Sequence, residues 1–509
     1  MSGASRQVLS GAILSYLGIG LSIVGGFLVT PLIIGHLGRS LYGVFTLSMS
    51  VVTLLTFDFG LNSAVARFVA YFEARGDRAS ALAVMRIVRS LYLVFSLLLL
   101  LSSALVWFGA PTLFSALTEE EVADFRVAFA LASGIMVLNF PLLPANGTLQ
   151  GLGRFVALRG SDVLWRLATI CVSVTVVYAK LSMFTLVVGL CSVALVTSLF
   201  RGAMCLRLRV WAWRLPRAPS DLRRDVARFT SWSFLVAIGQ RLMLTVMPAI
   251  LASLSGTVDV AGFAVAAMIE GYVWVVANAL NGLFLPQVAK LDSNGDQAGL
   301  QRLLEGVGRY QLIVVGLLVS GFVIFGRPFI DLWLGPDFSD VYPVAVLLIL
   351  PSLIVQTQEV AMSTLVARGD IRYRGIGTML AAVVNLGLAM VLVPEYGSLG
   401  AAVSIASGSF AGYIVAMNVA YSRRTGLSMS RFFYRVHGRM LPRLAVPVVG
   451  FFGILSVFNI VDLIGLVGWV LTYVALYCAW AWWVVLEREE RLSLRGLWRR
   501  RSGQVGAAS

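Results

Sequence analysis

The sequence contains little charge and almost no histidine. Only 13% of its 509 residues are charged and 59% are hydrophobic, whereas soluble domains average about 25% charged residues. The two histidines, His36 and His437, are too few and too far apart for a metal site or a catalytic pair, and no GxxxxGK[ST] phosphate loop is present. We therefore expect no soluble enzyme, no ATP-hydrolysing part, no metal and no cofactor.

Cysteine is also scarce. Cys171, Cys191, Cys205 and Cys478 lie in or beside apolar runs and show no CxxC spacing. This pattern indicates neither a disulfide framework nor a zinc site. The four cysteines are interpreted as small apolar packing residues.

Long apolar runs dominate what is present, and the mean hydropathy is +0.87. About 20 mainly apolar residues cross the roughly 30 Å hydrocarbon core as a helix, whereas a barrel strand needs only about 10 alternating residues. The sequence therefore predicts an all-α membrane protein with about 14 transmembrane helices. The expected spans are 12–34, 41–61, 87–109, 127–149, 160–178, 183–200, 229–251, 261–285, 310–326, 342–366, 376–393, 399–421, 444–461 and 464–486.

The basic residues that give the chain its net charge of +15 lie mainly in the loops between these spans. If the N-terminus is cytoplasmic, the basic residues gather in the cytoplasmic loops, and the outer loops hold only Arg39, Lys180 and Arg327. A nucleic-acid-binding protein would instead concentrate its basic residues on one soluble face. We predict both termini in the cytoplasm and no nucleic-acid partner.

An internal repeat connects the two halves. A shift of 219 residues aligns nine identical pairs, and a shift of 216 aligns Thr148 with Thr364 and Gly153 with Gly369. Two six-helix repeats have the same orientation in the membrane. We predict an N-terminal lobe at 1–206, a basic cytoplasmic linker at 207–228, a C-terminal lobe at 229–421, two added helices within 422–486 and a basic cytoplasmic tail at 487–509. The nine pairs are Gly43/Gly262, Met49/Met268, Leu61/Leu280, Asn62/Asn281, Val69/Val288, Ala70/Ala289, Gly76/Gly295, Asp77/Asp296 and Ala79/Ala298.

Three segments carry a family resemblance: Ser15 to Ala70, Leu149 to Phe155 (LQGLGRF) and Leu365 to Gly375 (LVARGDIRYRG). They resemble the polysaccharide repeat-unit flippases, exporters of O-antigen or lipid-linked oligosaccharide in the multidrug/oligosaccharidyl-lipid/polysaccharide exporter superfamily. The resemblance implies two lobes around a central cavity that opens alternately to each side of a bacterial inner membrane. The implied cargo is an undecaprenyl-diphosphate-linked oligosaccharide for cell-surface polysaccharide such as lipopolysaccharide O-antigen or exopolysaccharide.

The first span helps to choose among the families of this superfamily. Its multidrug antiporters usually carry a carboxylate there and its lipid II flippases carry arginines, and residues 12–34 contain neither. This favours the repeat-unit flippases.

Ionisable residues within a span cost roughly 2.5–3.5 kcal/mol and usually face a cavity or a partner. Arg241 lies in the seventh span beside Gln240, and its planar guanidinium suits a diphosphate. The alternatives are an ion pair with Glu270 that joins two spans, or a role in gating. Gln240 and Arg241 are our first substrate-binding candidates.

The eighth span carries Glu270, Trp274, Asn278 and Asn281 on one helical face. An indole face and amide groups suit a sugar, so these residues are further substrate-binding candidates, together with Asn62 at the related place in the first lobe. The alternative is that they join helices to one another.

Two other sets have candidate roles. The carboxylates Asp58, Glu270 and Glu359 are candidates for a coupling proton or sodium ion, unless Asp58 only meets Arg67 or a helix end. Four arginines near the expected inner ends of the first lobe are candidates for capturing the diphosphate headgroup, unless they only anchor the loops. They are Arg67, Arg86, Arg89 and Arg166.

Two alternative functions follow from the sequence. One is a small-molecule or drug exporter of the same superfamily. The other is a polysaccharide polymerase or ligase, but such enzymes usually present a large outer loop with catalytic Arg or His, and the outer loops here are short. We expect a non-enzyme whose partners are the lipid-linked oligosaccharide and the bilayer, with a polysaccharide polymerase as a candidate partner.

Overall fold

The computed structural model describes residues 3–56, 61–208, 210–211, 238–281, 284–455, 462–486 and 491. Every regular element in these ranges is a helix, which confirms the all-α class. Eleven of the described helices are long and apolar enough to cross a membrane, so the chain is a multi-pass membrane protein; the count of fourteen stays a prediction. The eleven are Ser10–Leu37, Arg78–Leu113, Glu119–Gly151, Phe155–Tyr178, Met183–Arg207, Thr257–Asn278, Gln297–Leu334, Val341–Ala367, Ile371–Thr425, Met429–Leu455 and Leu463–Val485.

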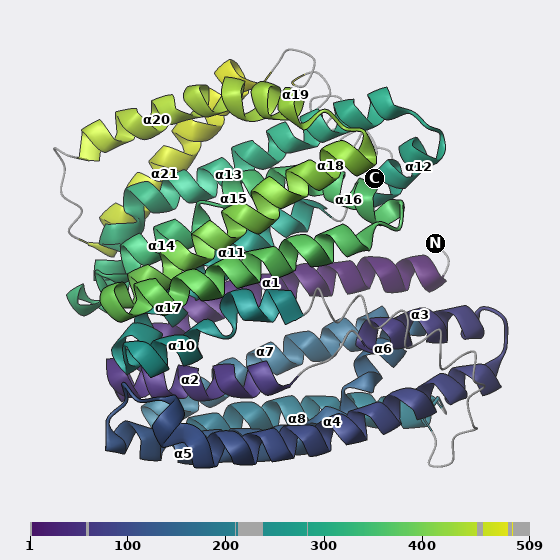
Figure 1. Ribbon diagram of the computed structural model, residues 1–509, viewed down its shortest axis with the longest axis vertical. Coiled ribbons are helices and arrows are strands. Elements are labelled where there is room, and N and C mark those ends of the chain that lie inside the picture. Colours follow the sequence, from purple (N-terminus) through teal and green to yellow (C-terminus); the bar gives the residue numbers. More distant parts are fainter. Residues whose placement is uncertain are drawn as a thin grey trace, which may run out of the picture. The chain divides into compact units, whose positions relative to one another are not determined.

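The first of two compact units contains residues 1–268 and 372–412. In it, α1 packs against α7, and α5 lies against α2, α4 and α8 (Figure 1). Its elements are α1 (Gly3–Leu37), α2 (Arg39–Leu55), α3 (Leu61–Glu73), α4 (Arg78–Leu113), α5 (Glu119–Asn139), η1 (Phe140–Leu142), α6 (Pro144–Gly151), α7 (Phe155–Tyr178), α8 (Met183–Arg207), α10 (Met247–Leu254), the start of α11 (Thr257–Asn281) and nearly all of α17 (Ile371–Ser409).

The second unit contains residues 269–371 and 413–509, with α13 packed on α14, α16, α20 and α21. This division by packing differs from the expected division into lobes, whose boundaries stay a prediction. The elements are the rest of α11, α12 (Leu285–Ser293), α13 (Gln297–Leu334), η2 (Pro336–Phe338), α14 (Val341–Ile349), α15 (Ser352–Val355), η3 (Gln356–Gln358), α16 (Glu359–Ala367), the end of η4 (Phe410–Ala416), α18 (Met417–Thr425), α19 (Met429–Phe433), η5 (Tyr434–Gly438), α20 (Arg439–Leu455), α21 (Leu463–Trp480) and η6 (Ala481–Val485).

Two turns in different units agree with the internal repeat. Gly76 and Gly295 have φ values of 68° and 67°, a conformation that favours glycine. The next residues, Asp77 and Asp296, cap α4 and α13 by accepting a hydrogen bond from the backbone N–H three residues later, at 3.0 and 2.7 Å. The packing also matches, because α3 lies on α4 and α6 in one unit, and α12 lies on α13 and α16 in the other.

The segment from 371 to 425 consists of two helices joined by a kink at Gly397, where φ is 53° and ψ is −130°. A Cβ atom at Gly408 would overlap the carbonyl oxygen of Ala381, and one at Gly412 would overlap that of Gly377. These pairs show that the helices run antiparallel with their backbones in close contact, as small residues allow in membrane proteins. They lie where the sequence predicted separate spans at 376–393 and 399–421.

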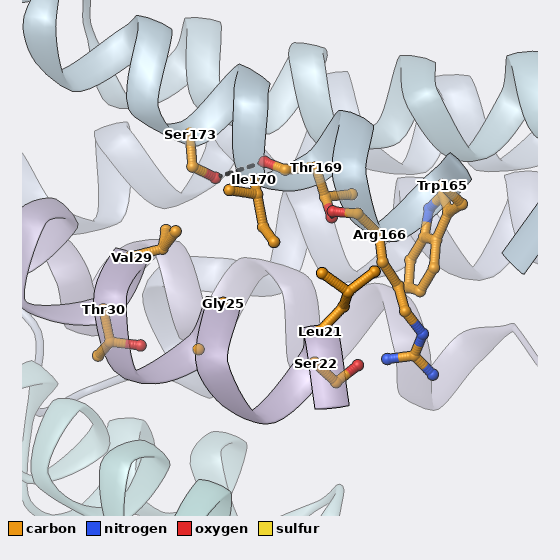
Figure 2. A pocket seen from close by; sticks show the side chains of 11 residues that line it. Leu21, Ser22, Gly25, Val29, Thr30, Trp165, Arg166, Thr169, Ile170 and Ser173 are labelled. Atoms are coloured by element: carbon orange, nitrogen blue, oxygen red, sulfur yellow. Dashed lines mark hydrogen bonds between the residues drawn. The ribbon is translucent and has the colours of Figure 1, made fainter. Parts of the chain in front are cut away.

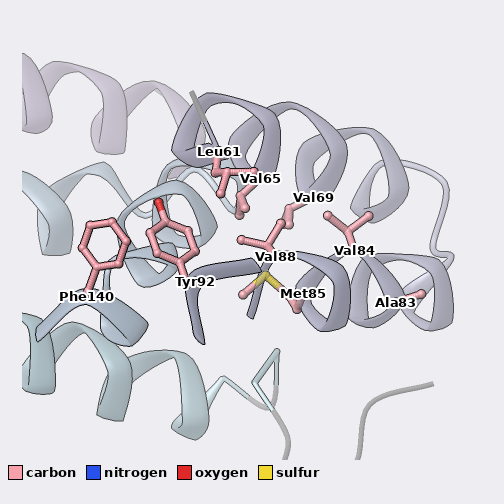
Figure 3. Packing of buried hydrophobic residues seen from close by; sticks show 9 residues of the cluster. All are labelled: Leu61, Val65, Val69, Ala83, Val84, Met85, Val88, Tyr92 and Phe140. Carbon is pink, nitrogen blue, oxygen red and sulfur yellow. The ribbon is translucent and has the colours of Figure 1, made fainter. Parts of the chain in front are cut away.

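A hydrophobic cluster joins α3, α4 and η1 (Figure 3). Leu61, Val65 and Val69 recur every fourth residue, so they share one face of α3 and pack on α4. Tyr92 of α4 meets Phe140 edge to face, with ring centroids 5.2 Å apart. This packing holds α3 against α4.

Candidate functional site

A pocket of about 210 Å³ lies between α1 and α7 in the first unit (Figure 2). Its wall is mostly apolar, but it includes one cation and several hydroxyl groups. Such a mixture of apolar surface and a few polar groups is typical of binding pockets. The lining residues are Leu21, Ser22, Gly25, Gly26, Val29, Thr30, Trp165, Arg166, Thr169, Ile170 and Ser173.

Arg166 is the cation of this pocket. It is the twelfth of the 24 residues of α7, so it lies at the middle of the helix and not at its end, where the sequence placed it. The difference arises because α7 begins at Phe155, five residues before the expected span. Its guanidinium extends from α7 toward α1 beside Trp165, 5.8 Å from that ring centroid (Figure 2). Its buried Nε has no hydrogen-bond partner among the described residues, and its guanidinium gives the pocket a positive charge.

A polar network holds α7 against α6 and α8. The buried Arg201 of α8 donates to Ser161 Oγ at 2.8 Å, to Asn146 Oδ1 at 2.7 Å and to Asp162 Oδ1 at 2.5 Å. Arg159 binds the other oxygen of Asp162 at 3.2 Å from a more exposed position. Three helices therefore share one buried guanidinium, and the network lies one turn before Arg166.

The first residues of α2, α5 and α11 meet at one carboxylate. Glu121 forms a capping box with Thr118 at the start of α5. Its Oε1 atom accepts hydrogen bonds from Ser40 and Thr257, both at 2.5 Å, and these two hydroxyl groups lie 3.2 Å apart. Hydrogen bonds to a charged group contribute about 1.5–3 kcal/mol each. We call Ser40, Glu121 and Thr257 the helix-end cluster; it connects the two halves of the chain.

Backbone packing reinforces the helix-end cluster. A Cβ atom at Gly43 of α2 would overlap the carbonyl oxygen of Thr257, so only glycine fits this contact. Nearby, the hydroxyl of Ser115 donates to the carbonyl oxygen of Ser253 at 3.0 Å. The hydroxyl of Ser253 in turn donates to the carbonyl oxygen of Leu113 at 2.5 Å. At this end of the helices the first and second halves of the chain are closely joined.

Arg241 binds the end of α2. Its guanidinium donates to the carbonyl oxygens of Thr53 and Thr56, the latter at 3.1 Å. These carbonyls belong to the C-terminal turn of α2, where a positive charge is favourable. Arg241 thus has a helix-capping contact that the sequence did not suggest, and its roles toward substrate, Glu270 and gating stay predictions. Gln240 beside it is exposed.

The expected polar face of α11 lies in the second unit. Glu270 is half-buried, Trp274 is 50% exposed, and Asn278 donates to the carbonyl oxygen of Trp274 at 2.9 Å. The side chain of Asn281 lies outside the described residues. An exposed indole beside a carboxylate is compatible with sugar binding, which stays a prediction.

Asn62 and three of the headgroup candidates are near α3 and α4. Asn62 Oδ1 accepts from the backbone N–H of Gly147 at 3.4 Å and so joins α3 to α6. Arg67 is exposed with its guanidinium 5.8 Å from the ring of Phe68, Arg86 is exposed, and Arg89 is half-buried. None of these three arginines lines the pocket that contains Arg166.

Two further coupling candidates are Asp58 and Glu359. Asp58 lies outside the described residues, and Glu359 is half-buried at the start of α16 after the buried Gln356. Among the described residues, no three His, Cys, Asp or Glu side chains gather as metal ligands would. The coupling role of Asp58, Glu270 and Glu359 stays a prediction.

Sequence reasoning missed the helix-end cluster and the network around Arg201. A signal existed for the first, because Thr118 and Glu121 have capping-box spacing, and Ser40 and Thr257 are 217 residues apart, close to the repeat offset. For the second, no pattern connects Arg201 with Asp162, which are 39 residues apart on different helices.

The fold is similar to that of solved membrane transporters. It is similar to the lipid II flippase MurJ in an inward closed conformation, with a TM-score of 0.66 and 12% identity, over 92% of this chain and 97% of that one. It is also similar to an inward-facing multidrug resistance transporter of the MATE family in the MOP superfamily, with a TM-score of 0.59 and 16% identity, over 84% and 96% of the two chains. At these identities the likeness concerns the fold alone.

The sequence places it in a family. Residues 8–291, more than half of the chain, match the family described as "Polysaccharide biosynthesis protein", and the chain belongs to that family. It is 22% identical to "Uncharacterized membrane protein EpsK" of Bacillus subtilis over 64% of each chain. It is 21% identical to "Probable low-salt glycan biosynthesis flippase Agl15" of Haloferax volcanii over 73% of this chain and 74% of that one. The match therefore spans just under two thirds of EpsK. The family resemblance expected from the sequence is confirmed.

Proposed function

We propose that this protein is a flippase that moves an undecaprenyl-diphosphate-linked oligosaccharide from the inner to the outer leaflet of a bacterial inner membrane. The observation that carries the proposal is the combination of a polysaccharide-biosynthesis family match with the fold of membrane transporters. The name of the relative from Haloferax volcanii supports the same activity. The product serves cell-surface polysaccharide such as O-antigen or exopolysaccharide, and a polymerase is the partner that uses it.

The helix-end cluster gives this proposal a mechanism. With both termini in the cytoplasm, α2 and α11 begin at the outer face, so the contacts among Ser40, Glu121 and Thr257 close the outer side. Alternating access requires these hydrogen bonds to break when the cavity opens outward. Because these hydrogen bonds are few, the free energy lost when they break is small enough to be offset by substrate binding.

Arg166 supplies the charge recognition in this proposal. Its guanidinium lies in a pocket at mid-helix, where two anionic phosphate groups would be the favoured ligand. With the cell interior negative, moving two negative charges outward is favoured by roughly 4–5 kcal/mol per 100 mV. The membrane potential therefore helps to drive export.

Transport in proteoliposomes tests both statements. We expect purified protein to make host-extracted lipid-linked oligosaccharide accessible to a membrane-impermeant periodate reagent. Arg166→Ala removes charge-assisted hydrogen bonds, so we expect an initial rate lower by about tenfold, and Arg166→Lys should retain part of the rate.

The matched control is Arg154→Ala, at the exposed start of the same helix, which should stay within about twofold of wild type. If Arg166→Ala transports at the wild-type rate, Arg166 has no part in recognition. If the wild-type protein moves no lipid-linked oligosaccharide but moves small cations, it is instead a small-molecule exporter of the same fold.

A further inference from the structure

A second cavity, of about 310 Å³, lies in the second unit between α13 and the helical segment formed by α19, η5 and α20. Arginine dominates its wall, which contains four guanidinium groups and one carboxylate. This composition differs from the mostly apolar pocket beside Arg166. We call it the arginine cavity; its lining residues are Glu305, Arg309, Arg435, Arg439, Met440 and Arg443.

The arginines share one face because of their spacing. Arg431, Arg435, Arg439 and Arg443 recur every fourth residue from α19 through η5 into α20. Four residues exceed one α-helical turn, so such a row would drift around a regular α-helix. The π-helical stretch of η5 has wider turns and offsets part of this drift. The last three arginines therefore line the same cavity.

Glu305, the one carboxylate of the arginine cavity, is already bound by other side chains. Buried Glu305 binds Arg431 at 2.9 Å and Arg435 at 3.0 Å, and it also accepts from Gln301 at 3.0 Å. Arg439 and Arg443 are exposed and have no ion pair among the described residues. The cavity therefore keeps an excess of positive charge with donors that point to no carboxylate of the described chain.

The cavity lies where the polar parts of two helices change to apolar parts. In α13, no charged residue follows Arg309 until Arg327. In α20, no charged residue follows Arg443. Trp480 of α21 donates its indole N–H to the carbonyl oxygen of Arg443 at 2.9 Å, and tryptophan is enriched at the headgroup level of membranes. This is the depth at which lipid phosphates lie.

We propose that the arginine cavity binds the phosphate group of an anionic phospholipid of the surrounding bilayer. Guanidinium groups form paired hydrogen bonds with phosphate oxygens, and basic pockets between membrane helices hold anionic headgroups. The boundary position favours a lipid over free inorganic phosphate, because the acyl chains then extend along the apolar faces of α13 and α20. The bound lipid fixes the segment from α19 to α20 on α13, independently of the transported cargo.

Native mass spectrometry of the full-length protein tests this proposal. The protein is released from nanodiscs of phosphatidylglycerol and phosphatidylcholine in equal amounts, and the bound lipids are counted. We expect wild type to retain one phosphatidylglycerol, and the Arg439→Gln/Arg443→Gln variant to retain at least about fivefold less, because two charge-assisted contacts are lost.

The matched control is Arg302→Gln/Arg423→Gln, which removes the same charge from exposed positions outside the cavity and should retain the lipid as wild type does. If the Gln variant does not fold, Arg439→Lys/Arg443→Lys replaces it; that variant keeps the charge, loses the paired donors and should retain about half or less of the lipid. Equal phosphatidylglycerol retention in wild type, cavity variant and control would overturn the proposal. Full displacement of the lipid by inorganic phosphate at millimolar concentration would also overturn it, in favour of a free-anion site.

Discussion

Cysteines introduced by Ser40→Cys and Thr257→Cys are expected to form a disulfide that stops export until it is reduced. The two hydroxyl oxygens lie 3.2 Å apart at the helix-end cluster, so sulfur atoms at these positions come within bonding reach. The cross-link would hold α2 and α11 together and prevent the outer side from opening. We expect export to fall by at least about tenfold and to recover after a reductant, since a covalent bond cannot be broken by substrate binding.

This experiment needs a background without other thiols. The native Cys171, Cys191, Cys205 and Cys478 are free and are replaced by alanine or serine first. The single variants Ser40→Cys and Thr257→Cys serve as controls and should export whether or not a reductant is present. Full export by a protein that is quantitatively cross-linked would show that this contact never has to open.

Replacement of Arg201 by leucine is expected to give the largest loss of stability. Arg201 is buried and serves Asp162, Ser161 and Asn146, so the variant leaves a partly buried carboxylate without its closest cation. Removing one partner of such a pair costs about 3 kcal/mol or more. We expect a much lower amount of folded protein and an unfolding midpoint at lower denaturant concentration, measured by fluorescence-detected size exclusion.

Arg159→Leu is the matched control, because Arg159 binds the same Asp162 from a side chain that is 42% exposed. Exposed pairs contribute about 0–1 kcal/mol, so this variant should resemble wild type. In the double variant Arg201→Leu/Asp162→Leu, no buried charge is left unpaired, and part of the stability should return. Wild-type stability of the single Arg201→Leu variant would show that the network does not hold α7 in place.

The sequence predicted the fold well where a long apolar run alone determines a helix. It also separated the two helices that meet at Gly397, because the polar residues around Glu395 interrupt the run. Periodicity could not give the true ends of helices. The expected span began at 160, but α7 begins at Phe155, because the apolar residues 155–158 and the polar residues 159–162 that follow them are also helical. For that reason Arg166 lies in the middle of α7, although the sequence predicted it near a helix end.

The site was less predictable because its contacts join residues that are distant in the sequence. The charge of Arg241 suggested a substrate or a carboxylate, whereas its described partners are backbone carbonyls of α2, which any sequence would present. Glu121 had no predicted role in the site. Its partners Ser40 and Thr257 lie 81 and 136 residues away, and only the folded chain brings them together.

Deletion of the gene in its host, followed by mass spectrometry of the undecaprenyl-linked lipids and analysis of the surface polysaccharide, tests the central claim most directly. If the protein is the flippase for a lipid-linked oligosaccharide, complete repeat units accumulate on the lipid and the surface polymer is lost, and the wild-type gene restores both. Unchanged lipids together with unchanged surface polymer would contradict the proposed function.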